Sequence, residues 1–174
     1  MGRVPLCIAD GVSIGQSRAI ECYIAKAYGL MGSSPLEEAQ IQSLSEHVKD
    51  MKENKGKAKT DEEKAAWFAN VAAPEQADKS NRKMQWHLGH IEACVGEDGY
   101  AVGGKASMAD ALLFNLLAEH APEATAMGGA EPMGNKAAVD EVVAKFPKVQ
   151  KILATFGSSE GMTKWLETRG PQLF

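Results

Sequence analysis

The spacing of apolar residues along this chain changes near residue 15. Before that point, one apolar run covers residues 4–9 and a second, β-branched run covers residues 12–14, with the dipeptide Asp10-Gly11 between them. Two short apolar runs joined by an Asp-Gly turn are typical of a β-hairpin. After residue 17, apolar residues recur at steps of three and four, which indicates α-helices. The pattern therefore predicts one hairpin followed by a mainly helical chain.

The first predicted helix begins directly after the hairpin. Its apolar stripe consists of Ala19, Ile20, Tyr23, Ile24 and Ala27. Ser17 precedes this stripe and is a residue type that caps helix N-termini, so we expect it to cap this helix. Gly29 follows the stripe and is expected to end the helix.

Strand-like patterning stops at residues 32–35, Gly-Ser-Ser-Pro, where we place a domain boundary. Further helices are predicted over residues 36–53, 83–95, 107–118, 139–146 and 149–156. The stretch from residue 49 to residue 64 is mostly charged, and we expect it to be a solvated helix end and loop. The segment from Ser107 is the most apolar and should be the buried central helix. Ser107 and Asp110 have the spacing of a capping box.

Length and composition limit the possible functions. The chain has 174 residues, of which 44% are hydrophobic, enough to bury the core of one domain or slightly more. Its 19 basic and 23 acidic residues give a net charge of -4, so nucleic acid is not expected as a partner. No apolar stretch approaches the ~20 residues that span a bilayer, and the first residues do not resemble a signal peptide. We expect a soluble, cytoplasmic protein without a membrane span.

The cysteines and histidines predict neither disulfides nor a metal centre. Cys7, Cys22 and Cys94 are an odd number of cysteines at unrelated spacings, which favours a reducing compartment and small buried thiols. His87 and His90 would share a helix face, but no third ligand is evident. We expect surface histidines and no metal site.

Several short motifs, taken in order, resemble the glutathione S-transferase family. They are Val4-Pro5, the Asp10-Gly11 turn, Gln16-Ser17-Arg18-Ala19-Ile20, Tyr23, Gly29-Leu30-Met31-Gly32, the segment from Gly103 to Asp110, Phe146-Pro147-Lys148-Val149 and the segment from Met162 to Leu166. The similarity is to sigma-, pi- or alpha-like members and covers nearly the whole chain. It implies a mainly α fold in which residues 1–32 form a partial thioredoxin-like domain, a truncated β-hairpin plus a helix. Residues 36–174 would form the family's all-helical C-terminal domain.

The resemblance begins just before the family's cis-proline hairpin. The family's preceding strand, helix and strand have no counterpart in this sequence, and the end of that first strand carries the Tyr, Ser or Cys that acts on the glutathione thiol. We therefore predict no catalytic residue here. Because the family's proline strand pairs with that first strand, residues 4–8 would present an open strand edge and an uncovered apolar face.

The resemblance also implies which residues bind glutathione. Ser17 stands at a helix N-terminus, where unpaired amides and the positive end of the helix dipole attract the γ-glutamyl α-carboxylate, and the Gln16 side chain would bind the same end of the ligand. If the bond between Val4 and Pro5 is cis, the Val4 backbone would pair with the cysteinyl part of glutathione. Arg3 lies next to this dipeptide, where the family often has a polar contact with glutathione.

Asp50 is the last candidate. In several classes of the family, an Asp on the first long helix reaches across a twofold dimer to the ammonium of the partner's glutathione, and Asp50 lies at the matching distance from Gln16 and Ser17. The resemblance thus implies a homodimer that repeats this contact in both sites. A plain surface carboxylate is the alternative interpretation of Asp50.

Two functions remain open. The first is a glutathione S-transferase that, once completed by the missing N-terminal segment, conjugates the thiol of its co-substrate glutathione to a small electrophile. The second is a non-catalytic transferase-like scaffold or subunit of a larger assembly, in which another protein covers the open strand edge. The resemblance favours the first function, and a test of conjugation distinguishes the two.

Overall fold

The hairpin predicted at the start of the chain is present. The computed structural model describes residues 5–69, 82–119 and 132–169. In these ranges the strands β1 (Leu6–Ala9) and β2 (Val12–Gly15) pair antiparallel, with Leu6 opposite Gly15. Asp10 and Gly11 have φ values of 49° and 78°, the left-handed conformations that a two-residue hairpin turn requires.

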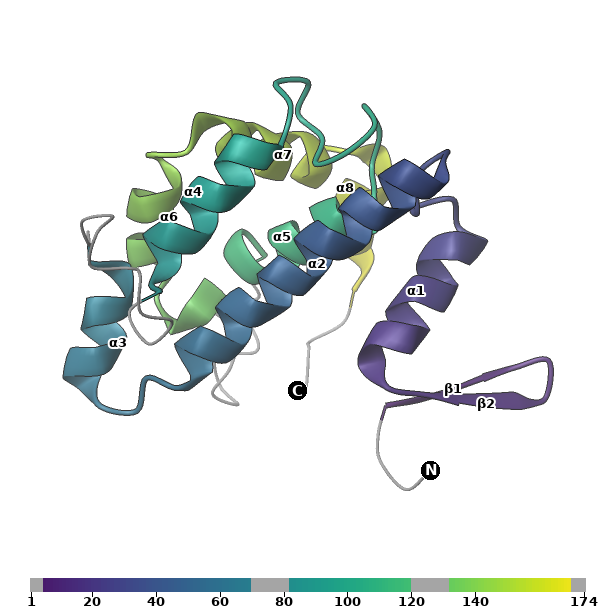
Figure 1. Ribbon diagram of the computed structural model, residues 1–174, viewed down its shortest axis with the longest axis horizontal. Helices are drawn as coiled ribbons and strands as arrows, with labels where there is room; N and C mark the ends of the chain where they lie inside the picture. Colours follow the sequence, from purple (N-terminus) through teal and green to yellow (C-terminus); the bar gives the residue numbers. More distant parts are fainter. Residues whose placement is uncertain (1–4, 70–81, 120–131, 170–174) are drawn as a thin grey trace.

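The next element is the helix α1 (Ser17–Ala27), which runs from the hairpin toward the body of the molecule (Figure 1). Its C-terminus ends in a Schellman motif. The N–H of Leu30 donates to the Ala25 carbonyl at 2.7 Å, and the N–H of Gly29 donates to the Lys26 carbonyl at 3.3 Å. Gly29 has a φ of 71°, so the prediction that this glycine ends the helix is confirmed.

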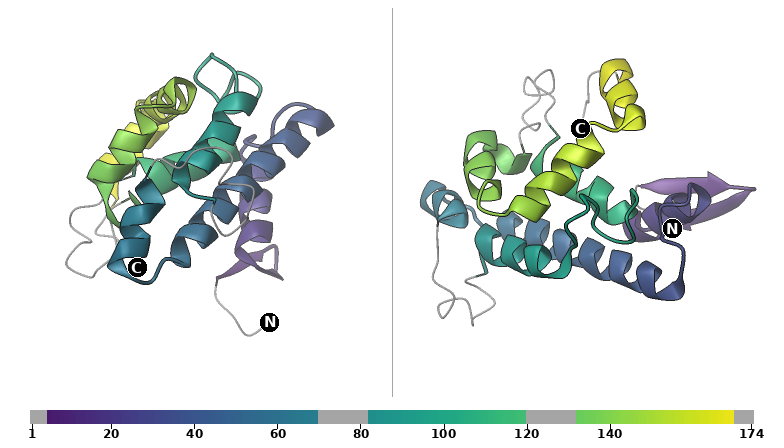
Figure 2. Two further views of the ribbon diagram at one scale, coloured as in Figure 1. Left: turned by 60° about the vertical axis from the view of Figure 1, so that its left-hand side comes forward. Right: turned by 90° about the horizontal axis from the view of Figure 1, so that it is seen from above.

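The remaining helices form a bundle around α5. They are α2 (Pro35–Gly56), α3 (Asp61–Phe68), α4 (Met84–Cys94), α5 (Met108–Leu117), α6 (Lys136–Val143), α7 (Pro147–Gly157) and α8 (Glu160–Thr168), with a short 3-10 helix η4 (Pro132–Gly134) before α6. α5 packs against α2 and α7, and α4 lies beside α2 (Figures 1 and 2). The chain is thus mainly α, with a helical bundle that follows a hairpin and one helix.

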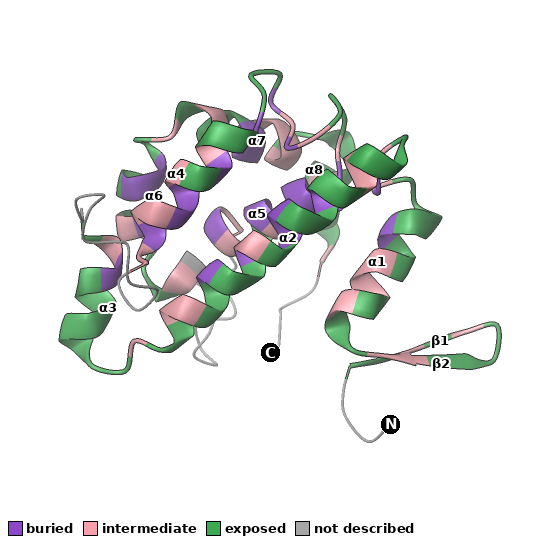
Figure 3. Cartoon of the chain, in the orientation of Figure 1, coloured by how far each residue is buried: buried purple, intermediate pink, exposed green. Residues whose placement is uncertain are grey.

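The core lies where α2, α4, α5 and α7 meet (Figure 3). Completely buried side chains there include Ile41, Leu88, Leu113 and Ile152. Six of the ten residues of α5 are buried, which confirms α5 as the central helix. Burial of these side chains supplies the main driving force for folding the bundle.

The start of α5 is fixed by the predicted capping box of Ser107 and Asp110. The Asp110 side chain is fully buried; its Oδ2 accepts from the Ser107 N–H at 2.8 Å and its Oδ1 accepts from the Ala101 N–H at 2.8 Å. Burial raises the pKa of the Asp110 carboxyl above its usual range, while these hydrogen bonds act in the opposite direction. One carboxylate therefore connects the helix start to the loop that precedes it.

Two helices, α3 and α8, lie outside the ranges that were predicted to be helical. The charged stretch that was predicted to be a loop contains the start of α3, where Thr60 and Glu63 form a second capping box. Trp67 is the one buried residue of this helix, with 2% of its surface exposed. With a single buried position, α3 has no apolar stripe for a periodicity argument to detect.

Two predictions about side-chain exposure were wrong. Cys94 is exposed, and Cys7 and Cys22 are only half-buried, so the thiols are not the buried ones that were expected. His87 is 1% exposed rather than a surface histidine, because it lies on the face of α4 that packs toward α2. His90 is exposed, as predicted.

The hairpin keeps its apolar face open. Within the described residues β1 pairs with β2 alone, and Leu6, Ile8 and Val12 are 46%, 69% and 63% exposed. The expected uncovered apolar face is therefore present. No helix in the described ranges has the length and apolar character needed to cross a membrane.

Candidate functional site

The candidate glutathione site lies where β2 leads into α1. Gln16 is the N-cap of α1, with φ 72° and ψ 120°, a conformation that non-glycine residues rarely adopt. Ser17 is already the first helical residue, and no side chain makes a capping hydrogen bond. The expectation that Ser17 caps α1 is therefore wrong. Gln16, with its positive φ, takes the N-cap position, so the helix begins one residue earlier than expected.

This geometry leaves the N-terminus of α1 accessible to a ligand. Gln16 and Ser17 are both exposed, and the first turn contains no acidic residue. The intrahelical hydrogen bonds of α1 begin at Ile20, whose N–H donates to the Gln16 carbonyl at 3.1 Å. Open amides, the Ser17 hydroxyl and the positive end of the helix dipole can together bind a carboxylate.

Two ion pairs hold α1 against α2. At the start of α1, Arg18 Nε donates to Glu46 Oε1 at 2.5 Å, and Arg18 Nη1 pairs with Glu21 at 3.1 Å. The hydrogen bond from Arg18 keeps the pKa of Glu46 below its usual range. At the other end of α1, Lys26 Nζ lies 2.8 Å from Glu38 Oε1. The position of Ser17 relative to α2 therefore depends on the Arg18–Glu46 pair.

Asp50 lies one helical turn after Glu46 on α2, about 6 Å farther along the helix axis. It is exposed, and no hydrogen bond or ion pair is recorded for it within the described ranges. The Asp50 carboxylate is therefore available to a ligand.

The other predicted glutathione ligands lie beside the hairpin. Pro5 is exposed and directly precedes β1. Because Leu6 pairs with Gly15, the antiparallel register places Pro5 level with Gln16. Arg3 and Val4 lie outside the described residues.

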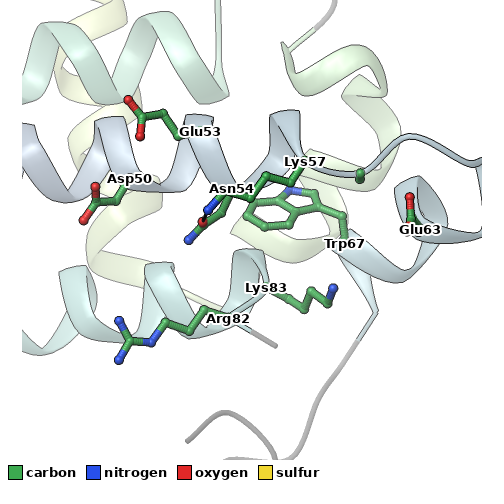
Figure 4. A pocket seen from close by; sticks show the side chains of 9 residues that line it. Asp50, Glu53, Asn54, Lys57, Glu63, Trp67, Arg82 and Lys83 are labelled. Carbon is green, nitrogen blue, oxygen red and sulfur yellow. Dashed lines mark hydrogen bonds between the residues drawn. The ribbon is translucent and has the colours of Figure 1, made fainter. Parts of the chain in front are cut away.

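Asp50 also lines a cleft that sequence reasoning did not find. The cleft has a volume of about 560 Å³ and lies between α2, α3 and the residues that lead into α4 (Figure 4); below it is called the α2–α4 cleft. Its charged lining includes Asp50 and Glu53 from α2 together with Arg82 and Lys83. These two groups are about 30 residues apart in the sequence, so no local spacing connects them.

A chain of hydrogen bonds leads from this cleft to two histidines. Lys57 Nζ donates to Asn54 Oδ1 at 2.7 Å, which orients the amide so that Asn54 Nδ2 donates to His87 Nε2 at 3.2 Å. His87 Nδ1 is then the protonated nitrogen. His47 Nε2 donates to the His87 carbonyl at 3.2 Å, so the 3.3 Å approach of His87 Nδ1 to this nitrogen is a ring contact rather than a hydrogen bond. Burial lowers the pKa of His87 to about 3 and also lowers that of His47, so both rings are neutral near pH 7.

The described ranges contain no group of three or more His, Cys, Asp or Glu side chains arranged to hold a metal ion. Although His47, His87 and His90 lie near one another, their rings pack against each other and against Trp86. The ring centroids of Trp86 and His90 are 4.0 Å apart. This arrangement is an aromatic cluster rather than a set of ligands directed at one point.

Residues 46–169 match the family model of the glutathione S-transferase C-terminal domain. The chain is 34% identical over 126 residues to glutathione S-transferase 1 of Ascaris suum, covering 67% of this chain and 57% of the relative. It is 28% identical over 169 residues to the probable glutathione S-transferase 7 of Caenorhabditis elegans, covering 97% of this chain and 74% of the relative. Its fold is similar to that of the monomeric glutathione S-transferase Na-GST-3 of the hookworm Necator americanus, with a TM-score of 0.68 and 23% identity over 99% of this chain and 77% of that one.

Proposed function

Because this chain belongs to the glutathione S-transferase family, we propose that it binds glutathione at the N-terminus of α1. The observation that carries the proposal is the open start of this helix, where Gln16 adopts a φ of 72° and no side chain caps the first turn. The γ-glutamyl α-carboxylate accepts hydrogen bonds from the first-turn amides and from the Ser17 hydroxyl. The Gln16 side chain both donates and accepts at the same end of the ligand.

The hairpin and a second copy of the chain supply the remaining contacts of the proposed site. The register that places Pro5 level with Gln16 supports a continuous surface along which the Val4 backbone pairs with the cysteinyl part of glutathione. The guanidinium of Arg3 binds a carboxylate of the same ligand. Asp50 of one subunit binds the ammonium of the glutathione held by its partner in a twofold homodimer.

We further propose that the chain is part of a cytoplasmic enzyme with two domains. Residues 1–32 belong to the glutathione-binding domain, and residues 36–174 form the helical domain. The reaction is conjugation, in which the glutathione thiolate attacks a small electrophile. By the family resemblance, the residue that activates the thiol follows a strand with no counterpart in the described ranges, so conjugation by this chain depends on a segment that supplies that residue.

Replacement of Ser17 by Ala tests the binding site directly. We expect the affinity for glutathione to fall by about 1 to 3 kcal/mol, because a hydrogen bond to the charged carboxylate is lost. Isothermal titration calorimetry with glutathione measures the change. Since Ser17 makes no capping bond, the free energy of unfolding should stay within about 0.5 kcal/mol of its original value.

Ser13→Ala is a matched control, because Ser13 is an exposed serine on β2, four residues before Ser17. It should leave the affinity for glutathione unchanged. Unchanged affinity in the Ser17→Ala variant, or an equal loss in both variants, would contradict the proposed role of Ser17.

A further inference from the structure

We propose that the α2–α4 cleft is a second binding site, which takes a small zwitterion with one ammonium and one carboxylate group, such as a free amino acid or a short peptide. Its volume of about 560 Å³ lies within the range of about 300–1,000 Å³ that is common for small-molecule sites. The proposal does not depend on Gln16 or Ser17, although it shares Asp50 with the contact proposed across the homodimer.

The two walls of the cleft carry opposite charges. Asp50 lies on α2, and Arg82 and Lys83 lie across from it at the start of α4, whereas the Glu53 carboxylate on α2 is turned away from these two cations (Figure 4). Figure 4 shows the Asp50 carboxylate and the Arg82 guanidinium at the same end of the cleft, without a bond between them. No ion pair in the described ranges joins one wall to the other; Glu53 has only a 4.0 Å contact with Lys49 on its own helix. A ligand that carries both charges can bridge these walls.

Two observations favour a carboxylate at the basic wall. Lys83 is the N-cap of α4, and no side chain caps this helix, so its first-turn amides remain open. The Nε atom of Arg82 is buried and has no hydrogen-bond partner in the part of the chain that the structure describes. The guanidinium carbon of Arg82 lies 4.2 Å from the centroid of the Trp86 ring, which holds the group in place. Because Nε is covered, a carboxylate in the cleft would bind the charged guanidinium through its other nitrogens.

The other charged residues of the lining are already engaged. Lys57 donates to Asn54, and Glu63 accepts from the backbone N–H groups of Lys59 and Thr60 at 2.7 and 3.0 Å. Asn54 is in turn held by His87. The charges that face each other across the cleft are therefore Asp50 on α2 and the two cations before α4.

The cleft also has a rigid lining, because Trp67 is 2% exposed and its indole N–H points to Met133 Sδ at 3.4 Å. The Asn54 amide, held on both sides, lies next to this indole (Figure 4). The buried Trp67 thus keeps the floor of the cleft in place, and the Asn54 amide is the group that can contact the ligand backbone. Preorganised groups of this kind reduce the ordering cost of binding.

The three tryptophans allow a test by NMR on the full chain. Trp67 lines the cleft, Trp86 lies beneath Arg82, and Trp165 on α8 serves as an internal control. We expect triglycine to shift the indole N–H signals of Trp67 and Trp86 saturably and to leave that of Trp165 unchanged. N-acetyltriglycine, which lacks the ammonium, and triglycinamide, which lacks the carboxylate, should each bind at least about fivefold more weakly. Equal binding of the three peptides, or no saturable shift by triglycine, would overturn the proposal.

Substitutions in each wall test the same point from the protein side. Arg82→Gln and Asp50→Asn each remove one charge of the cleft, whereas Lys145→Gln removes an exposed charge beyond α6 and serves as the matched control. We expect each cleft variant to weaken triglycine binding at least about fivefold and the control to leave it unchanged. Native-like spectra verify that the variants fold. Triglycine binding that is insensitive to both cleft substitutions would refute the assignment.

Titrations with glycine and glutathione identify the source of the zwitterion. Weaker binding of glycine than of triglycine favours a peptide over a free amino acid, because it means that the longer backbone places its two charged ends better against the two walls. Glutathione that shifts the Trp67 and Trp86 signals in the Ser17→Ala variant as well binds the cleft directly. Loss of that shift in Ser17→Ala assigns it to the α1 site and contradicts direct binding of glutathione, while the triglycine result still decides the proposal for other peptides.

Discussion

The segment that carries the proposed glutathione site and the helical bundle differ sharply in burial. Between residues 5 and 27, all of which the structure describes, Ala25 is the one buried residue. In α5 alone, six residues are buried (Figure 3). Large apolar side chains of the first segment, among them Ile8 at 69% exposure and Tyr23 at 43%, remain in contact with solvent.

This contrast shows that the two regions are held by different forces. The bundle is stabilised by a continuous apolar core, to which the hairpin and α1 contribute little more than Ala25 and the half-buried Cys22; their other attachments are a few polar contacts. These are the Arg18–Glu46 and Lys26–Glu38 pairs and a hydrogen bond of 2.9 Å from the Met108 N–H to the Leu30 carbonyl. A segment with so few buried contacts can open at a lower free energy than the whole molecule. The proposed site is thus placed on the part of the chain that is easiest to displace.

A matched pair of isoleucine substitutions gives the largest test of this contrast. Ile152 on α7 is fully buried, and Ile8 on β1 is 69% exposed. We expect Ile152→Ala to lower the free energy of unfolding by about 2–5 kcal/mol, because it leaves a cavity in the core. Ile8→Ala should change it by less than about 0.5 kcal/mol. Urea denaturation measures both, and a cost for Ile8→Ala close to that of Ile152→Ala would show that the hairpin is packed after all.

Acid should act on the bundle rather than on the hairpin, through His87. The pKa of this buried ring is about 3 when folded and 6.5 when unfolded, so the unfolded state binds more protons between these values. The stabilising effect of the neutral ring is complete above pH 6.5 and is lost progressively as the pH falls toward 3. Between pH 7 and pH 5 the linkage limit is about 2 kcal/mol, and screening by the polar surroundings reduces the expected loss to about 1 kcal/mol.

Urea denaturation at a series of pH values checks this slope. The groups that face His87 are His47 on α2 together with Arg82 and His90, and the lowered pKa of His47 adds to the effect in the same direction. His87→Gln should flatten the dependence between pH 7 and pH 5, whatever its effect on overall stability. His90→Gln replaces an exposed ring on the same helix and should keep the original slope. If both variants keep it, His87 is not its source.

The sequence predicted those features that depend on local patterns. The Asp10-Gly11 turn, the end of α1 at Gly29 and the capping box of Ser107 and Asp110 each depend on residues within a few positions of one another. The Thr60–Glu63 capping box of α3 is equally local, and it was available as a signal but was overlooked among the charged residues.

The features that were missed arise from packing between distant segments. The burial of His87 and the α2–α4 cleft both result from the contact of α2 with α4, which no spacing within either helix reveals. Ser17 was predicted to be the N-cap, but a positive φ at Gln16 determines where α1 begins. A glutamine in a sequence does not predict a positive φ, because this conformation is rare for residues other than glycine. Gln16 and Ser17 were therefore correctly placed at a helix start, but the local geometry that exposes the amides was not predictable.

The Arg18–Glu46 pair gives the smallest and most local test of the contrast. Arg18→Met keeps the aliphatic stem but removes the charge that joins the start of α1 to α2. We expect a cost of about 0.5–1 kcal/mol, since the Arg18 side chain is 23% exposed and such pairs contribute little. The change should appear mainly as faster hydrogen exchange of α1 amides, with the amides of α5 unaffected. Lys26→Met is the matched control at the other end of α1, where the side chain is 59% exposed, and it should have a smaller effect near Ser17. Arg18 holds the pKa of Glu46 below its usual value of 4.5. The difference in stability between Arg18→Met and the original protein should therefore vanish when the pH falls below the pKa of Glu46, because the protonated carboxyl no longer pairs with Arg18. A uniform acceleration of exchange across α1 and α5 would instead mean that the hairpin and α1 unfold only together with the bundle.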